Sequence, residues 1–341
     1  DHGGEITLEV DGVGGEWNSG EALSVTLVDQ DMNLNSRADE DLSVATSTHI
    51  IPSVKIGDPI TLASLSSTTP IIIYSDANPS VAQHTIGQDA GTGYAVESFS
   101  DRLNLGLETA NSGGVEIDDS GALALRYSTT VADVQDFMKG GTTEYNGTKN
   151  AIRTFINYDL RSLETNSTTG NSKILADAAI NITFASADDN TSLSWAGESD
   201  TTDIVPARSI GEARSLTNNQ TSCLYTTSFS GLCDITNLDW GSLGSTGTSE
   251  LVIVYNFTGG ATNDVAAGNY TIVSDIFRFG TSGDGVSAGD RYNDAIYRAE
   301  LEETGDNTGI FEGSMEYIML NQLNINNSGQ YTSLDLSLKP H

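Results

Sequence analysis

Residues 21–41 read EALSVTLVDQDMNLNSRADED. Leu23, Val25 and Leu27 alternate with other residues, which predicts a strand with one buried face. The stretch then becomes polar, so a loop should follow the strand directly. Similar alternation recurs along most of the chain between turns rich in Gly, Ser, Thr, Asn and Asp. This pattern predicts an all-β protein.

Further strands are expected from three other alternating sets of residues. These sets are Ile6, Leu8 and Val10; Ile180, Ile182 and Phe184; and Leu334, Leu336 and Leu338. The continuous apolar runs PIIIY (70–74) and LVIVY (251–255) predict strands buried on both faces. One short helix is expected in TTVADVQDFM (129–138), where Thr130 and Asp133 can form a capping box.

The two ends of the chain have clearer strand patterns than the middle. We therefore predict a β-sandwich formed by residues 1–62 and 251–341. Residues 63–250 would be a long inserted β-rich elaboration, or a second sandwich. Separate consecutive sandwiches are the alternative.

The chain is strongly acidic. Its 341 residues hold 47 Asp and Glu against 15 Lys and Arg, a formal net charge of −32. Such a surface repels nucleic acid, which we exclude as a partner, and it raises the local concentration of cations. No apolar run reaches the ~18 residues needed to cross a bilayer, so direct membrane insertion of this segment is not expected.

Oxygen-bearing side chains recur at regular spacing in residues 29–40. Counted as a twelve-residue calcium loop, positions 1, 3, 5, 7 and 12 are Asp29, Asp31, Asn33, Asn35 and Glu40. An EF-hand is excluded because Leu34 stands where that loop needs glycine, and because a strand precedes the loop. The spacing predicts a structural calcium site on a β scaffold. The alternative is an Asx-rich turn whose side chains cap backbone groups.

Two features favour an extracellular protein. Cys223 and Cys233 are the only cysteines and lie ten positions apart, which favours a disulfide, with two reduced buried thiols as the alternative. Eight Asn-x-Ser/Thr sequons are candidate glycosylation sites. They begin at Asn146, Asn166, Asn181, Asn190, Asn219, Asn256, Asn269 and Asn326.

No pattern indicates catalysis. His occurs four times, without a second His or Cys at the spacing of a zinc site, and no GxSxG elbow is present. A carboxylate pair for glycoside hydrolysis has no specificity among 47 acidic residues. We predict neither catalytic nor organic-cofactor-binding residues, and therefore no enzyme.

Four blocks of sequence resemble the surface-layer (S-layer) proteins of ammonia-oxidising archaea. They are SGEALSVTLVDQDMNLNSRADEDL (19–42), IPSVKIGDPITL (51–62), NYDLRSL (157–163) and YNDAIYRAELEETGDNTGIFEGSMEYIMLNQLNI (292–325). Residues 165–250 look divergent. The resemblance implies a secreted, acidic glycoprotein of Ig-like domains, of which this chain would be one part.

The resemblance also implies a function. Copies of the subunit would assemble with divalent cations into a porous, negatively charged lattice at the cell surface, which admits ammonium. The alternative is an extracellular adhesin or glycan-binding β-sandwich module, which would gather exposed aromatic side chains in one concave site and remain monomeric in calcium.

Overall fold

The fold is taken from a computed structural model. It describes residues 3–9, 22–67, 70–74, 83–86, 93–107, 121–139, 152–164, 179–187, 205–210, 223–226, 229–236, 249–258, 268–281 and 291–316. These residues form antiparallel β-sheets with a single α-helix in the described part of the chain. The predicted all-β fold with one short helix is confirmed.

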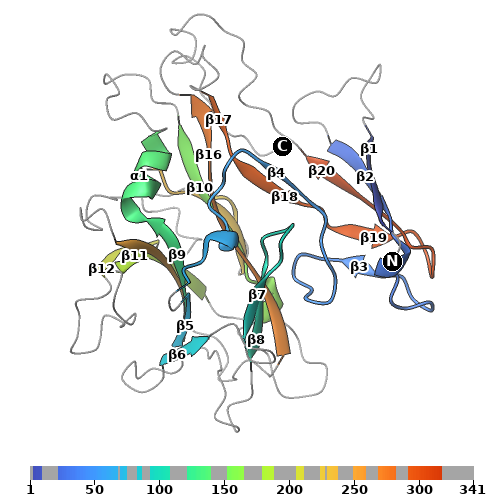
Figure 1. The fold of residues 1–341 in the computed structure, drawn as a ribbon, viewed down its shortest axis with the longest axis horizontal. Coiled ribbons are helices and arrows are strands. Elements are labelled where there is room, and N and C mark those ends of the chain that lie inside the picture. The colour runs from blue at the N-terminus through green and yellow to red at the C-terminus, as the bar shows by residue number, and fades with distance from the viewer. Residues whose placement is uncertain are drawn as a thin grey trace, which may run out of the picture.

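A five-stranded sheet joins the two ends of the chain. Its order is β1 (Glu5–Glu9), β2 (Ala22–Val28), β20 (Ile310–Glu316), β19 (Leu301–Glu303) and β3 (Asp41–Leu42). In Figure 1 the blue β1 and β2 lie beside the orange-red β20 and β19. Val25, Leu27, Leu301 and Phe311 on its inner face pack with Val273 of a neighbouring sheet.

Two larger sheets contain most of the remaining strands. One has the order β13 (Cys223–Thr226), β14 (Ser230–Asp234), β10 (Arg153–Asp159), β16 (Gly268–Thr281), β8 (Leu103–Leu107) and β7 (Tyr94–Val96), with β17 (Arg291–Asn293) beside β16. The other has the order β12 (Val205–Ile210), β11 (Ala179–Ala187), β15 (Glu250–Thr258), β9 (Ala122–Thr130), β5 (Ile71–Tyr74) and β6 (Gln83–Ile86).

The remaining strand pair is β4 (Ser53–Ile56) with β18 (Ala295–Arg298). The described residues also contain three 3₁₀ turns, namely η1 (Gln30–Met32), η2 (Leu62–Ser64) and η4 (Arg161–Glu164).

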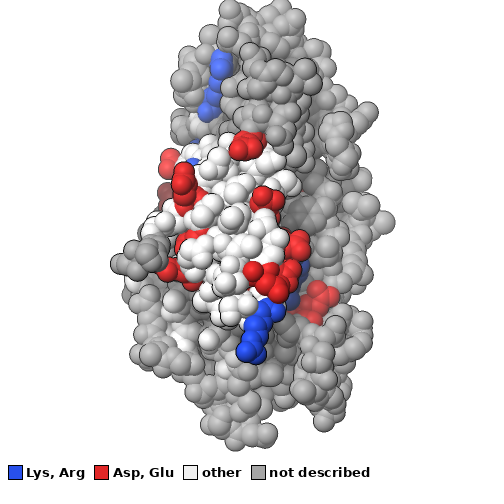
Figure 2. Space-filling model, turned by 90° about the vertical axis from the view of Figure 1, so that its right-hand side faces the viewer, with Lys and Arg blue, Asp and Glu red and all other residues white. Residues whose placement is uncertain are grey.

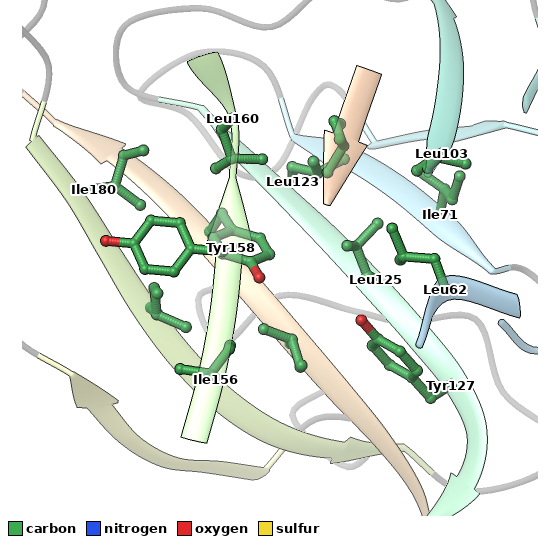
Figure 3. Packing of buried hydrophobic residues seen from close by; sticks show 14 of the residues in the cluster. Leu62, Ile71, Leu103, Leu123, Leu125, Tyr127, Ile156, Tyr158, Leu160 and Ile180 are labelled. Atoms are coloured by element: carbon green, nitrogen blue, oxygen red, sulfur yellow. The ribbon is translucent and has the colours of Figure 1, made fainter. Parts of the chain in front are cut away.

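The main hydrophobic core lies between these two larger sheets. Figure 3 shows Ile71 and Leu125 from one sheet and Ile156 and Tyr158 from the other within this core. Residues 251–255 of β15 are all buried, and they alternate between the main core and a second cluster on the opposite face of their sheet. Residues 71–73 of β5 behave in the same way, so both continuous apolar runs form strands buried on two faces, as predicted.

The helix α1 (Val131–Lys139) begins where the sequence predicts. Thr130 Oγ1 accepts the Asp133 N–H at 3.1 Å, and the Asp133 carboxylate accepts the Thr130 N–H at 3.1 Å. This reciprocal pair satisfies backbone donors of the first turn that have no partner inside the helix. Val131 and Val134 are buried, and Phe137 packs against the main core.

The strands that follow residue 249 belong to different sheets. β15 and β16 pair with strands from the middle of the chain, whereas β19 and β20 pair with β2 and β3. The five-stranded sheet therefore draws on residues 5–42 and 301–316, a narrower set than the predicted sandwich of both chain ends. Among the described residues, no helix is long and apolar enough to span a membrane.

Not every expected strand residue is buried. Ile6 and Leu8 of β1 pair with Leu27 and Val25, yet they remain 47% and 45% exposed. The reason is their position on an edge strand of the five-stranded sheet. Val10 and the set Leu334, Leu336 and Leu338 lie outside the described residues.

Candidate functional site

Two loops lie against each other at one end of the five-stranded sheet. The first, residues 29–40, links β2 to β3. The second, residues 303–309, consists of Glu303 at the end of β19 and the connection 304–309 to β20. The Asp29 N–H donates to the Gly309 carbonyl at 2.9 Å, and Gln30 Nε2 donates to the Thr308 carbonyl at 2.7 Å. We call residues 29–40 and 303–309 the loop pair.

The second loop needs unusual backbone conformations to make its turn. Asn307 and Gly309 both adopt positive φ, 60° and 61°, a region that asparagine and glycine enter more readily than other residues. A Cβ at position 309 would lie 2.3 Å from Gln30 Nε2, so glycine also permits the close approach of the first loop.

The predicted calcium ligands of the first loop have different partners. Asp29 Oδ1 accepts the Asp31 N–H at 2.9 Å, and Asn35 Oδ1 accepts the Arg37 N–H at 3.2 Å. In both cases a side-chain oxygen accepts a hydrogen bond from the backbone N–H two residues further along the chain, which is the pattern of an Asx turn. Asn33 Nδ2 instead donates to Asn307 Oδ1 at 3.1 Å, across the loop pair.

Asp31 is exposed, and its N–H takes part in the Asp29 turn. The described residues contain no group of three or more His, Cys, Asp or Glu side chains that could hold a metal. The five-residue calcium loop stays a prediction, whereas Asp29 and Asn35 make the contacts expected of an Asx-rich turn.

Glu40, the fifth predicted ligand, lies at the inner end of the loop pair beside Glu303. Glu40 is 9% exposed and Glu303 is 3% exposed. The Glu40 N–H donates to Glu303 Oε2 at 3.3 Å. Glu303 Oε1 accepts the N–H groups of Thr308 at 2.8 Å and Gly309 at 2.7 Å.

These donors stabilise the ionised form of Glu303. Burial acts to raise its pKa, but the Gly309 N–H, the Glu40 side chain and N–H, and the Thr308 N–H together lower the pKa below its usual value. Both carboxyl oxygens of Glu40 are buried, and apart from the neighbouring Glu303 carboxyl group no described side chain or backbone N–H offers them a hydrogen bond.

The outer face of the same sheet carries a row of acidic side chains. Glu302 of β19 lies directly opposite Asp41 of β3 on one side and Glu312 of β20 on the other. All three residues are exposed. We call Asp41, Glu302 and Glu312 the acidic row. Figure 2, which views this side of the molecule, shows acidic residues spaced around a largely uncharged surface.

The cysteines are close neighbours in one sheet. Cys223 of β13 is the cross-strand partner of Cys233 of β14. Cβ atoms of directly opposed residues are about 4.5–5.5 Å apart in antiparallel pairs, near the range that a disulfide requires. The predicted pairing is therefore compatible with the register.

Three of the eight sequon asparagines lie in described strands. Asn181 of β11 and Asn256 of β15 are cross-strand partners, and the Asn256 amide donates to Thr183 Oγ1 at 3.2 Å. Asn269 is exposed near the start of β16. The other five lie outside the described residues: Asn146, Asn166, Asn190, Asn219 and Asn326.

Glu303 is the residue of this region that the sequence does not single out. It is one of 47 acidic residues, and it lies 263 positions from Glu40 along the chain. The one available signal is the turn-forming segment ETGDNTG (303–309), which begins with Glu303. No protein-family model matches the chain, and comparison with curated proteins gives no match either.

Proposed function

We propose that this chain is a structural subunit of an extracellular surface layer. Copies of it assemble into a porous two-dimensional lattice with negatively charged walls, which admits cations such as ammonium. Calcium stabilises the assembly. The proposal rests on the four resembling sequence blocks, on the net charge of −32 and on the placement of the acidic row.

The acidic row is the structural observation that supports this function best. Like charges placed directly opposite each other on a sheet destabilise it, by roughly 0.2–1 kcal/mol per pair. Folding gains nothing from Asp41, Glu302 and Glu312 in one row on a solvent-facing surface. Such a cost is reasonable if the surface has to attract cations or bind them between neighbouring copies.

Charge selectivity follows from the same carboxylates. A wall of negative charge concentrates monovalent cations and retards anions within about one Debye length, ~10 Å at 0.1 M salt. Pores that are narrow on this scale would admit ammonium and slow the entry of anionic solutes. This is permeation without chemistry, so the proposed function needs no catalytic residue.

The alternative, an adhesin or glycan-binding module, has less support in the described residues. Sugar-binding sites use exposed aromatic rings as stacking surfaces. Phe99 is the one aromatic residue among the large hydrophobic side chains that are exposed in the described part of the chain. A single ring does not make a concave aromatic site.

An exported protein also accounts for the cysteines and the sequons. We propose that Cys223 and Cys233, which oppose each other across β13 and β14, form a disulfide. We propose Asn269 as a glycan acceptor because it is exposed. Asn256 fits this role less well, since its side-chain amide already has a hydrogen-bond partner.

A sedimentation experiment tests the proposal. The dissolved chain is mixed with Ca²⁺ or with a chelator and then centrifuged. A lattice subunit becomes pelletable in Ca²⁺ and returns to solution when the chelator is added in excess. A chain that stays monomeric in both conditions behaves as the adhesin or glycan-binding alternative requires.

A further inference from the structure

The strongest unexplained feature of the described residues is the contact between Glu40 and Glu303. Both side chains are more than nine-tenths buried. Neither carboxylate forms an ion pair with a described Lys, Arg or His side chain, although eight such pairs occur elsewhere in the described residues. Buried acidic groups without a positive partner are costly.

The two carboxyl groups are not equivalent. Glu303 is surrounded by donors, because the Thr308 and Gly309 N–H groups bind one oxygen and the Glu40 N–H binds the other. Glu40 has two buried oxygens, and apart from the Glu303 carboxyl group no described donor offers them a hydrogen bond. The pair therefore offers acceptor oxygens in excess, and it requires a positive charge.

A shared proton and a bound metal ion are the two carriers of that charge. A proton on Glu40 would occupy one oxygen of its carboxyl group. The other oxygen of Glu40 would stay buried without a hydrogen-bond donor. A metal ion can contact both oxygens of one carboxylate, as the bidentate glutamate of calcium loops does. The metal ion thus satisfies more of the observed acceptors.

We propose that Glu40 and Glu303 bind one divalent hard cation, with Ca²⁺ as the ion to test, and that this ion joins the two loops of the loop pair. Two carboxylates balance the charge of one divalent ion. No third His, Cys, Asp or Glu completes a metal cluster with this pair in the described residues, so the remaining ligands are neutral oxygens of carbonyls, amides or water. The site differs from the predicted twelve-residue loop, because Glu303 takes the place of Asp29 and Asp31.

This inference deepens the calcium part of the proposed function and is tested on dissolved chains, so its outcome is separate from that of lattice assembly. Binding of Ca²⁺ to wild type and Glu40→Gln is measured by isothermal titration calorimetry below the concentration at which material pellets. The control is Asp136→Asn, which neutralises an exposed acidic residue of α1. Glutamine keeps the size of glutamate and removes the charge.

The expected result is one Ca²⁺ site per chain in wild type and in the control. In Glu40→Gln the affinity of this site for Ca²⁺ falls about tenfold or more. Losses of this size follow when even a group that only supports a metal ligand is removed. Equal affinity in all three proteins would overturn the proposal. The proposal would also be overturned if wild type lacked this site and Glu40→Gln were more stable than wild type by a margin that grows as the pH rises. That result would mean that the carboxyl pair holds a proton.

A second measurement needs no variant, in case Glu40→Gln does not fold. Amide hydrogen exchange of the wild-type chain is followed by mass spectrometry with about 1 mM Ca²⁺, the range of extracellular calcium modules, and with a chelator. Ca²⁺ should slow exchange in peptides that contain residues 29–40 and 303–309. Unchanged exchange in both peptides would contradict the site.

Discussion

Arg102 and Glu97 form a two-pronged ion pair. Arg102 Nε lies 2.9 Å from Glu97 Oε2, and Arg102 Nη2 lies 2.9 Å from Glu97 Oε1. The guanidinium is fully buried, and it also donates to the carbonyls of Val44 at 2.8 Å and Thr46 at 3.0 Å. One side chain thus fastens the segment after β3 to the turn before β8.

Replacing this guanidinium with an amine should destabilise the protein strongly. Lysine cannot reproduce the planar fork, so Arg102→Lys leaves buried acceptors unpaired, and we expect a loss of about 2–4 kcal/mol in the free energy of unfolding. Urea denaturation measures it. Arg37→Lys, at an exposed loop position, is the control and should change stability by less than about 0.5 kcal/mol. Similar small effects for both variants would mean that Arg102 does not fasten the two segments.

A buried hydroxyl group at the centre of the core provides a second test. Ser274 Oγ accepts hydrogen bonds from Tyr127 Oη at 2.8 Å and from Tyr255 Oη at 2.6 Å. Ser274→Ala should cost about 1–3 kcal/mol because it leaves a buried hydroxyl without its partner. In a double-mutant cycle, Tyr255→Phe combined with Ser274→Ala should cost less than the sum of the single changes. Strict additivity would show that the Tyr255–Ser274 contact contributes nothing.

Acid should remove part of the stability through Glu300. Burial acts to raise its pKa, but Arg161, the Val44 N–H and Ser43 outweigh burial and lower the pKa below its ordinary 4.5. A lowered pKa means that the contribution of Glu300 is present above pH 4.5 and is lost as the pH falls through the lower folded-state value.

The comparison that isolates this effect is wild type against Glu300→Gln. Denaturation is measured from neutral pH down to acid, and the difference in unfolding free energy between the two proteins should shrink below pH 4.5. A difference that stays constant over this range, or one that widens in acid, would show that Glu300 does not have a lowered pKa.

Removing the central charge of the acidic row should stabilise the dissolved chain. Glu302 has an acidic partner on both sides, so Glu302→Gln should raise the unfolding free energy by about 0.2–1 kcal/mol at low salt. The gain should decrease as salt is added because exposed charges are screened. Asp136→Asn is again the control. A loss of stability in Glu302→Gln at low salt would mean that the row carries no repulsion.

Local features of the fold were predictable from the sequence, and pairing between distant segments was not. The runs at 70–74 and 251–255 required burial on both faces, and Thr130 with Asp133 determined where the helix begins. By contrast, nothing in the local pattern indicated that β10 pairs with β16. In this pairing Phe155 of β10 lies opposite Phe277 of β16. Strand partners depend on how the whole core packs, which periodicity does not encode.

The candidate site shows the same limit. Residues 29–40 were identifiable from their oxygen-bearing side chains, and the sequence predicts Glu40 as the fifth ligand of that loop, which stays a prediction. Its neighbour Glu303 is the last residue of β19 and lies 263 positions away along the chain. An acidic residue in an acidic chain has no distinguishing pattern, so only the structure could bring the two together.

The central claim is that calcium assembles this chain into a charged lattice, and electron microscopy of negatively stained protein tests it most directly. Wild type and a variant with Asp41→Asn, Glu302→Gln and Glu312→Gln are imaged with Ca²⁺ and with chelator. We predict ordered sheets for wild type in Ca²⁺, none in chelator, and fewer or disordered sheets for the variant. Dispersed single particles of wild type in Ca²⁺, with the same appearance in chelator, would contradict the proposed function.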